Sequence, residues 1–352
     1  MSHPTWSQYA DLAQHGLEHY FGAPAPQLLN NTYPAGDNEV FNYWWLAHAI
    51  DARLDAYART GDPAWLDSAR AIEANLRERN GDQLFNDYFD DMLWYALALV
   101  RLHDASGEQR YLDDARAIHA HVHRHGWNDT LGWSLAWRTQ QLDYKNTPAN
   151  GPFVILSARL FELAPDPELL GLAQMSFDWL TRTMVGPDGF VEDGINRLGD
   201  GAVDRQWRFS YNQGLYIGAA LALTSATSLD LVPLATRTAL AALDALAPDG
   251  VIAREGSGGD EGLFKGVLYR YLGLLVDRLD AADPDRARLV EFVRVSTDAL
   301  VASATDPTST APVPLLASDD WRVRVEPPVY YSTQLSAIMA LELRAAIEND
   351  AA

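Results

Sequence analysis

Two adjacent carboxylic acids, Asp90 and Asp91, have the residue type and spacing best suited to chemistry in this chain. They lie in the segment NDYFDDMLW at residues 86–94. The apolar and aromatic residues around them predict a largely buried segment, where neighbouring carboxylates are costly unless they are used. Neighbouring Cα atoms are about 3.8 Å apart, and consecutive side chains on a helix diverge by roughly 100°. The two carboxyl groups can therefore lie about 5–5.5 Å apart, as in retaining glycosidases, rather than the roughly 6.5–9.5 Å of inverting ones.

The surroundings of the pair predict different protonation states for the two acids. Burial and mutual repulsion are expected to raise the pKa of one carboxyl group, which makes it a proton donor, while the start of a helix keeps the other ionised as a nucleophile. A simpler interpretation stays open, in which both acids only complement the dipole at a helix N-terminus.

The elements that position this pair form a repeat. Residues 59–72 (RTGDPAWLDSARAI) are similar to residues 105–118 (ASGEQRYLDDARAI), and weaker copies follow at 164–177, 225–238 and 281–294. In each copy a short Gly/Asp/Pro turn ends one helix and a Pro or a good helix former opens the next. A fixed repeat of this kind indicates stacked pairs of helices.

The repeat predicts an all-α fold of six inner and six outer helices. The inner helices are expected at the more apolar stretches, 39–59, 88–104, 150–164, 210–224, 262–280 and 330–348. The outer helices are expected at the amphipathic stretches, 5–20, 63–79, 108–124, 167–183, 229–246 and 284–302. This arrangement is an (α/α)6 toroid, with an open helical solenoid as the alternative. Short β-like pieces are expected near 189–193 and 321–325.

A closed ring predicts one catalytic domain over residues 1–352 with a functional face. The connections from outer to inner helices are the long, polar ones: 22–38, 80–87, 125–147, 184–209, 247–261 and 303–329. Such connections lie on a single face of the toroid, so function is expected there.

Composition narrows the possible partners. The chain carries 48 acidic and 27 basic residues for a formal charge of −21, which argues against nucleic acid or an anionic membrane surface as a partner. It has no cysteine, which excludes thiolate metal sites and cysteine nucleophiles. No signal peptide or membrane-spanning stretch is visible, so a cytoplasmic location is expected. The oligomeric state is not predicted.

The stretch FNDYFDDMLWYALALVRLHDASGEQRYLDDA resembles the glycoside hydrolase family 76 α-1,6-mannanases, whose hallmark is a consecutive Asp-Asp pair on an inner helix. Further blocks follow the family's order: Asn42-Tyr43-Trp44-Trp45 with His48, Trp127-Asn128-Asp129-Thr130, Lys145-Asn146 with Asn150-Gly151, Asp193-Gly194, Tyr211-Asn212-Gln213-Gly214 and Phe264-Lys265-Gly266. The Asp-Asp and Tyr-Asn-Gln-Gly blocks are the most specific.

The resemblance implies roles for individual residues. Asp90 would be the nucleophile and Asp91 the acid/base. The residues implied to line the cleft are Asn42, Trp45, His48, Tyr88, Trp133, Asn146, Asn150, Asp193, Tyr211, Asn212, Gln213 and Lys265. Among these, the residues implied to bond mannose hydroxyls are Asn146, Asn150, Asn212, Gln213 and Asp193. Those implied to stack on sugar rings are Tyr88, Trp133 and Tyr211. No metal or organic cofactor is implied.

Structural roles compete with these assignments. Asn150 can instead cap a helix, and Asn212 and Gln213 can satisfy loop backbone. The four histidines at positions 119, 121, 123 and 125 point to different faces at helical spacing, so a metal site is disfavoured there.

The resemblance predicts a retaining glycoside hydrolase that cleaves α-1,6-mannosidic linkages in mannan or manno-oligosaccharides. Bulk at Leu131 and Trp133 and the long 303–329 connection are departures from the family's pattern that could narrow an open groove. An exo-acting α-1,6-mannosidase or mannobiosidase is therefore one alternative to endo action. A sugar epimerase is another, although it needs a second inner-helix histidine besides His48. A non-catalytic glycan-binding toroid is the alternative outside enzymes.

Overall fold

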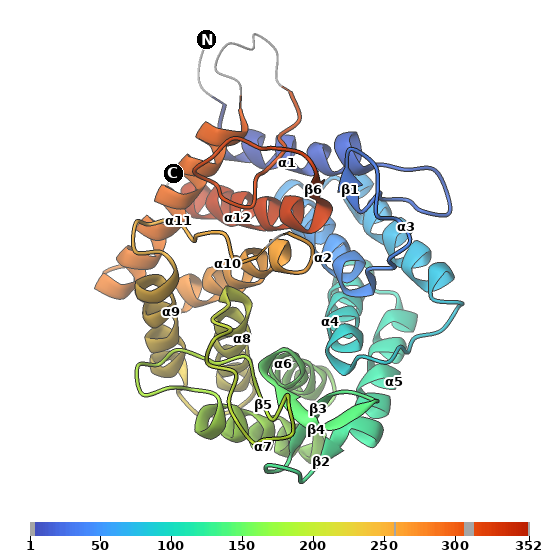
Figure 1. Ribbon diagram of the computed structural model, residues 1–352, viewed down its shortest axis with the longest axis vertical. Coiled ribbons are helices and arrows are strands. Elements are labelled where there is room, and N and C mark those ends of the chain that lie inside the picture. The colour runs from blue at the N-terminus through green and yellow to red at the C-terminus, as the bar shows by residue number, and fades with distance from the viewer. Residues whose placement is uncertain (1–3, 257, 306–312, 351–352) are drawn as a thin grey trace. The chain divides into compact units, whose positions relative to one another are not determined.

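The computed structural model describes residues 4–256, 258–305 and 313–350. Part of the predicted 303–329 connection, residues 306–312, therefore lies outside the described residues. Twelve helices occur in the described part of the chain (Figure 1). The odd-numbered ones are α1 (Trp6–Phe21), α3 (Pro63–Arg79), α5 (Gln109–Gly126), α7 (Pro167–Thr183), α9 (Val232–Leu246) and α11 (Pro284–Ala304). The even-numbered ones are α2 (Tyr43–Thr60), α4 (Phe89–Ser106), α6 (Thr147–Leu163), α8 (Ser210–Ala226), α10 (Glu261–Arg278) and α12 (Tyr331–Asp350).

Burial alternates along the chain as the apolar and amphipathic stretches predict. Most residues of α2, α4, α6 and α8 are buried, whereas fewer than half are buried in α1, α3, α5, α7 and α11. An even-numbered helix is apolar around most of its circumference because it packs on several neighbours, while an odd-numbered one shows a polar face to water.

The sequence repeat has a physical basis in the turns between paired helices. Gly61 after α2 and Gly107 after α4 occupy the same place in the two clearest copies, with φ of 69° and 72°. Only glycine adopts this left-handed conformation without a steric penalty, so it ends both helices. Asp166 and Asp283 start α7 and α11 with side-chain caps, each followed by a proline in the first turn.

The strands are a feature that the sequence analysis largely missed. A four-stranded antiparallel sheet has the order β2 (Trp127–Asn128), β3 (Ser134–Arg138), β4 (Gln141–Asn146) and β5 (Gly194–Ile195). A second sheet pairs β1 (Thr32–Tyr33) with β6 (Val329–Tyr330). The piece expected near 189–193 lies just before β5, with Val191 in an isolated bridge to Val185. The piece expected near 321–325 is wrong, because Trp321 and Arg322 form a turn.

The described chain divides into two compact units. Unit 1 comprises Met1–Arg79, Leu243–Gly273 and Asp280–Ala352, and unit 2 comprises Asn80–Ala242 and Leu274–Leu279. In unit 1, α12 packs on α1, α2 and α11, and α2 packs on α3. In unit 2, α6 packs on α4, α7 and α8, and β3 lies against α4 and α6. The single domain over residues 1–352 stays a prediction.

None of the described helices is long and apolar enough to cross a membrane.

Candidate active site

The first turn of α4 carries both candidate catalytic carboxylates. Tyr88 occupies the N-cap position of the helix, so Asp90 and Asp91 follow at its positively polarised start. Asp90 is buried, and its Oδ1 accepts the backbone N–H of Asp91 at 3.1 Å while its Oδ2 accepts the indole N–H of Trp137 at 3.0 Å. Asp91 is half-buried, and its Oδ2 accepts a hydrogen bond from Asn86 at 3.2 Å. The two neighbouring acids therefore have different environments.

The hairpin of β3 and β4 places Trp137 within hydrogen-bond distance of Asp90. An isolated bridge joins Arg138 to Tyr88, and the backbone N–H of Thr139 donates to the carbonyl of Asp87 at 2.9 Å. The end of β3 is thus tied to the start of α4. The Trp137 ring meets Tyr88 edge-on, with 5.5 Å between ring centroids.

Asn150 holds this hairpin on α6. It is fully buried, its amide donates to the carbonyls of Leu135 and Asn146, and its Oδ1 accepts from the Leu135 N–H and the Ser176 hydroxyl, all at 2.9 Å. All four of its hydrogen-bonding positions are used within the protein, so the geometry favours a structural role over the predicted sugar contact. The role differs from simple helix capping, because Asn146 is the residue that caps α6.

The side chain of Lys145 holds the backbone of the β2–β3 loop through hydrogen bonds. Its buried ammonium donates to the carbonyls of Asn128, Gly132 and Ser134 at 2.7, 2.6 and 3.1 Å. Burial lowers the pKa of Lys145 to about 8. The amine organises the backbone that precedes β3.

Asp193 is the centre of a buried network in unit 2. Its Oδ1 accepts from the Tyr211 hydroxyl at 2.8 Å and the Asn212 amide at 3.1 Å, and its Oδ2 accepts from Arg197 at 3.0 Å and the Tyr144 hydroxyl at 3.2 Å. Burial raises the pKa of Asp193, against the opposing effect of these hydrogen bonds. Asp193 therefore positions two residues that the sequence analysis assigned to sugar binding.

Tyr211 connects this network to the carboxylate pair. Burial, then Asp193, and more weakly the charge of Asp90 raise the pKa of the Tyr211 hydroxyl, which stays protonated. Tyr211 thus lies within electrostatic reach of Asp90 while its own proton is committed to Asp193.

Arg197 is a site residue that the sequence analysis missed. Its guanidinium lies 3.7 Å from the ring centre of Trp207 and 4.4 Å from that of Tyr144, and it also donates to Asp204 at 3.0 Å. Trp207 is partly exposed and Asp204 is buried. No local motif marks Arg197, Trp207 and Asp204, because they come from one loop and are brought together by contacts of the Arg197 guanidinium. Trp137 was not among the predicted site residues either.

The side chain of Gln213 satisfies loop backbone, which was the structural alternative to sugar binding. Its side chain pairs with the backbone N–H and C=O of Val191 at 2.8 and 2.7 Å and is fully buried. Asn212 is also buried, with its Oδ1 lacking a hydrogen-bond partner among the described residues.

Unit 1 carries four of the predicted cleft residues, Asn42, Trp45, His48 and Lys265. Trp45 is buried, and its indole N–H donates to Asp260 at 2.8 Å; the half-buried Trp44 donates to the same oxygen at 3.0 Å. His48 is buried beside the Trp44 ring. Of the aromatic doublet, Trp44 rather than Trp45 is therefore the more accessible ring.

The other two unit 1 candidates differ in exposure. Lys265 is buried, donates to the Asp319 carbonyl, and has its pKa lowered by burial. Asn42 is half-buried at the N-cap position of α2 and makes no side-chain capping bond. The Lys265 ammonium is therefore committed to a backbone carbonyl.

Trp133 is an exposed aromatic residue of unit 2, with 53% of its surface accessible, and Leu131 nearby is 40% exposed. The loop that carries them is fixed by Trp179, whose indole N–H donates to the Leu131 carbonyl at 2.9 Å. An exposed flat ring on a fixed loop is suited to stacking on a sugar.

The histidine series on α5 has structural partners. His119 is buried, stacks on Phe153 and bonds Ser157 at 2.8 Å, while His121 stacks on Phe85. Over the described residues, no group of three or more His, Cys, Asp or Glu side chains is arranged to hold a metal ion.

These features define the class of protein. It is a helical protein in which two adjacent carboxylates lie in the first turn of α4, surrounded by aromatic rings and amide side chains. Comparison with known proteins identifies the family. The model of "Glycosyl hydrolase family 76" matches residues 5–315, and the chain belongs to this family.

Two solved structures are similar to this one over nearly the whole chain. The Lin0763 protein from Listeria innocua is 42% identical, with a TM-score of 0.93 and 99% of each chain covered. The α-1,6-mannanase GH76A of Salegentibacter sp. HEL1_6, as an inactive variant with two consecutive aspartates replaced by asparagine and in complex with α-1,6-mannotriose, is 32% identical. Its TM-score is 0.89, with 97% of this chain and 99% of that chain covered. The predicted all-α, (α/α)6 fold class is confirmed.

A curated relative is more distant. The mannan endo-1,6-alpha-mannosidase DCW1 of Saccharomyces cerevisiae is 24% identical over 262 residues, which are 66% of this chain and 57% of the yeast protein. The chain spans about half the length of the curated relatives that it matches.

Proposed function

We propose that this protein is a retaining glycosidase that cleaves α-1,6-mannosidic linkages, with Asp90 as nucleophile and Asp91 as acid/base. The observation that carries the proposal is the difference between the two acids. Asp90 is buried and accepts two hydrogen bonds from N–H donors, which favour its charged form. Asp91 is half-buried, and its Oδ2 accepts a hydrogen bond from the neutral amide of Asn86.

The reaction uses these two states in sequence. A carboxylate oxygen of Asp90 attacks the anomeric carbon while the bond to the leaving oxygen breaks, and Asp91 gives that oxygen its proton. The products of this step are a mannosyl ester on Asp90 and the leaving part of the chain, which now carries a free hydroxyl group. Asp91 then removes a proton from water, whose oxygen displaces Asp90 and restores the original anomeric configuration.

The relatives support the choice of substrate. The Salegentibacter protein is an α-1,6-mannanase whose variant with two replaced aspartates is inactive and binds α-1,6-mannotriose. The yeast relative is named a mannan endo-1,6-alpha-mannosidase. We propose endo action on a neutral α-1,6-mannose chain as the main mode, with release of a terminal unit as the alternative.

The first test removes each carboxylate in turn. Asp90→Asn and Asp91→Asn are expected to lose at least about 10³-fold in hydrolysis of α-1,6-mannotetraose while still binding it, because nucleophile and acid/base act as a unit. Asp113→Asn is the matched control, since Asp113 also belongs to an adjacent Asp pair but is exposed on α5. Full activity in either site variant contradicts the proposal, and a chain that binds but never hydrolyses is a glycan-binding protein instead.

Two further measurements resolve the finer points. NMR of the first product shows an α-anomer for retention and a β-anomer for inversion. Sizing the products of α-1,6-mannan over time separates endo action, which gives a ladder of lengths early, from exo action, which gives a single short product throughout.

A further inference from the structure

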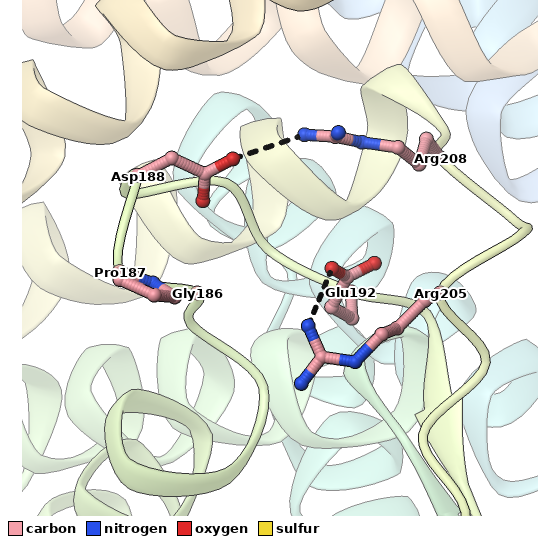
Figure 2. A pocket seen from close by; sticks show the side chains of 6 residues that line it. All are labelled: Gly186, Pro187, Asp188, Glu192, Arg205 and Arg208. Carbon is pink, nitrogen blue, oxygen red and sulfur yellow. Dashed lines mark hydrogen bonds and ion pairs between the residues drawn. The ribbon is translucent and has the colours of Figure 1, made fainter.

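The pocket in the segment between α7 and α8 contains charged side chains that pair with one another (Figure 2). It has a volume of about 530 Å³. Asp188 pairs with Arg208 and Glu192 with Arg205, at N–O distances of 3.3 and 3.9 Å. These charges thus have partners within the pocket, whereas a different segment of unit 2, residues 80–88 between α3 and α4, contacts the carboxylate pair directly.

Asn86 is the residue of this connection that contacts Asp91. Its half-buried side chain donates from Nδ2 to Asp91 Oδ2 at 3.2 Å, and its Oδ1 accepts the backbone N–H of Tyr88 at 2.8 Å. The second bond fixes the orientation of the amide, because a backbone N–H can only donate and must face the oxygen. The NH₂ group therefore faces Asp91. A carboxyl group offers an acceptor oxygen whether it is ionised or protonated, so this contact persists while Asp91 gives and takes a proton.

Contacts on both sides of Asn86 hold the connection in place. Before it, the Phe85 ring stacks on His121 of α5, with 3.9 Å between ring centroids. After it, the Asp87 carbonyl accepts the backbone N–H of Thr139 at 2.9 Å, and the Asp87 carboxylate accepts the Thr139 hydroxyl at 3.2 Å. Because α5 packs on α4, Asn86 is fixed relative to the start of α4 before substrate binds, as a positioning group must be.

Each carboxylate of the pair receives a donor from a different segment. Trp137 on β3 donates to Asp90, and Asn86 in the α3–α4 connection donates to Asp91. A carboxyl group that transfers a proton must stay aimed at the leaving oxygen, and a misplacement of about 1 Å can cost roughly 100-fold in rate. An amide donor on one oxygen restricts the rotation of the Asp91 carboxyl group.

A purely structural role for Asn86 is the competing explanation. The bond from the Tyr88 N–H to Asn86 Oδ1 forms an Asx turn, which orders the chain at the N-cap of α4. Aspartate forms the same turn with nearly the same side-chain shape, but an ionised aspartate has no N–H to offer Asp91. Asn86→Asp therefore separates the two roles.

We propose that Asn86 is a positioning residue, which holds the Asp91 carboxyl group in the orientation that proton transfer to the leaving oxygen requires. The inference rests on the proposed role of Asp91 as acid/base. Asn86 is then needed where the leaving group requires a proton, and is dispensable where the leaving group departs as a stable anion.

The test compares two substrates that differ in the leaving group. For α-1,6-mannotetraose, whose leaving oxygen needs a proton, Asn86→Asp and Asn86→Ala are expected to lower kcat/KM about tenfold or more, because a hydrogen bond to a charged group is lost. For 2,4-dinitrophenyl α-1,6-mannotrioside, dinitrophenolate leaves unprotonated, so kcat/KM for its release is expected to stay within about twofold of wild type. Its kcat and KM are expected to fall together, because the later attack by water still needs Asp91 as base.

Two further variants calibrate the comparison. Asn349→Asp makes the same change at an exposed position on α12 and is expected to match wild type on both substrates. Asp91→Asn removes the acid itself, so it is expected to lose hydrolysis of α-1,6-mannotetraose and to keep kcat/KM for release of dinitrophenolate. The Asn86 variants are expected to show the same pattern in weaker form.

The outcomes separate this inference from the proposed function. Wild-type hydrolysis of α-1,6-mannotetraose by Asn86→Asp overturns the inference in favour of the turn, and equal losses on both substrates overturn it in favour of a general defect. Asn86→Asp keeps the turn, so the test stays valid if Asn86→Ala does not fold. If Asp91→Asn loses both substrates equally, the proposed role of Asp91 fails and the inference fails with it. If the wild type hydrolyses neither substrate, the proposed function itself is wrong.

Discussion

The hydrogen bond from Trp137 to Asp90 provides a sharp test of the proposed nucleophile. Trp137→Phe removes the indole N–H that lies 3.0 Å from Asp90 Oδ2 and keeps an aromatic ring in place. A hydrogen bond to a charged group contributes about 1.5–3 kcal/mol, which corresponds to roughly 10- to 100-fold in rate. We therefore expect kcat/KM for α-1,6-mannotetraose to fall by about this factor.

The pH profile distinguishes this role from a general structural defect. Without the indole donor the ionised form of Asp90 is less favoured, so the acidic limb of kcat/KM is expected to move to higher pH. Trp65→Phe on α3 is the control, because it removes an indole N–H from unit 1. A Trp137→Phe enzyme within about twofold of wild type, with an unshifted acidic limb, would refute the reasoning.

Three further predictions concern stability. Asn150→Ala leaves the backbone N–H and C=O of Leu135 buried without a partner, so the free energy of unfolding in urea is expected to fall by about 3 kcal/mol. Asp193→Asn removes the charge that faces Arg197 and is expected to cost about 3 kcal/mol in the same measurement. His119 has its pKa lowered to about 4 by burial and then by His123. The unfolded chain therefore binds a proton below pH 6.5 that the folded chain excludes, and stability falls by about 3 kcal/mol between pH 6.5 and pH 4. Urea melts of wild type and His119→Gln over this range are expected to diverge by that amount, with the variant losing less.

Each stability prediction has a matched control. Asn75→Ala removes a single exposed hydrogen bond, and Asp178→Asn breaks an exposed ion pair, so both are expected to cost about 1 kcal/mol or less. His125→Gln, at an exposed position on α5, is expected to keep the wild-type slope with pH. A site variant that behaves like its control contradicts the corresponding prediction.

The sequence by itself determined the helices and their order. α2 and α4 end at glycines because the residue after each helix adopts a left-handed conformation that glycine tolerates best. α7 and α11 start at an Asp cap that is followed by a proline. Hydrophobic content separated the even-numbered helices from the odd-numbered ones. These signals are local, acting within one or two helical turns, and are therefore readable without a structure.

The sequence did not reveal the hairpin of β3 and β4. Ser134, Leu135 and Ala136 are all buried, as are Tyr144, Lys145 and Asn146, so neither strand shows the alternation that marks a half-exposed strand. The hairpin is stabilised by Asn150 on α6, a contact between segments rather than a property of either strand.

The tertiary structure also decided which polar residues are available to a ligand. Asn150 and Gln213 look like sugar-binding amides in the sequence, but backbone groups from distant segments occupy their hydrogen-bonding positions. Residue type and spacing indicate what chemistry is possible, whereas the partners of each polar atom depend on how remote segments pack.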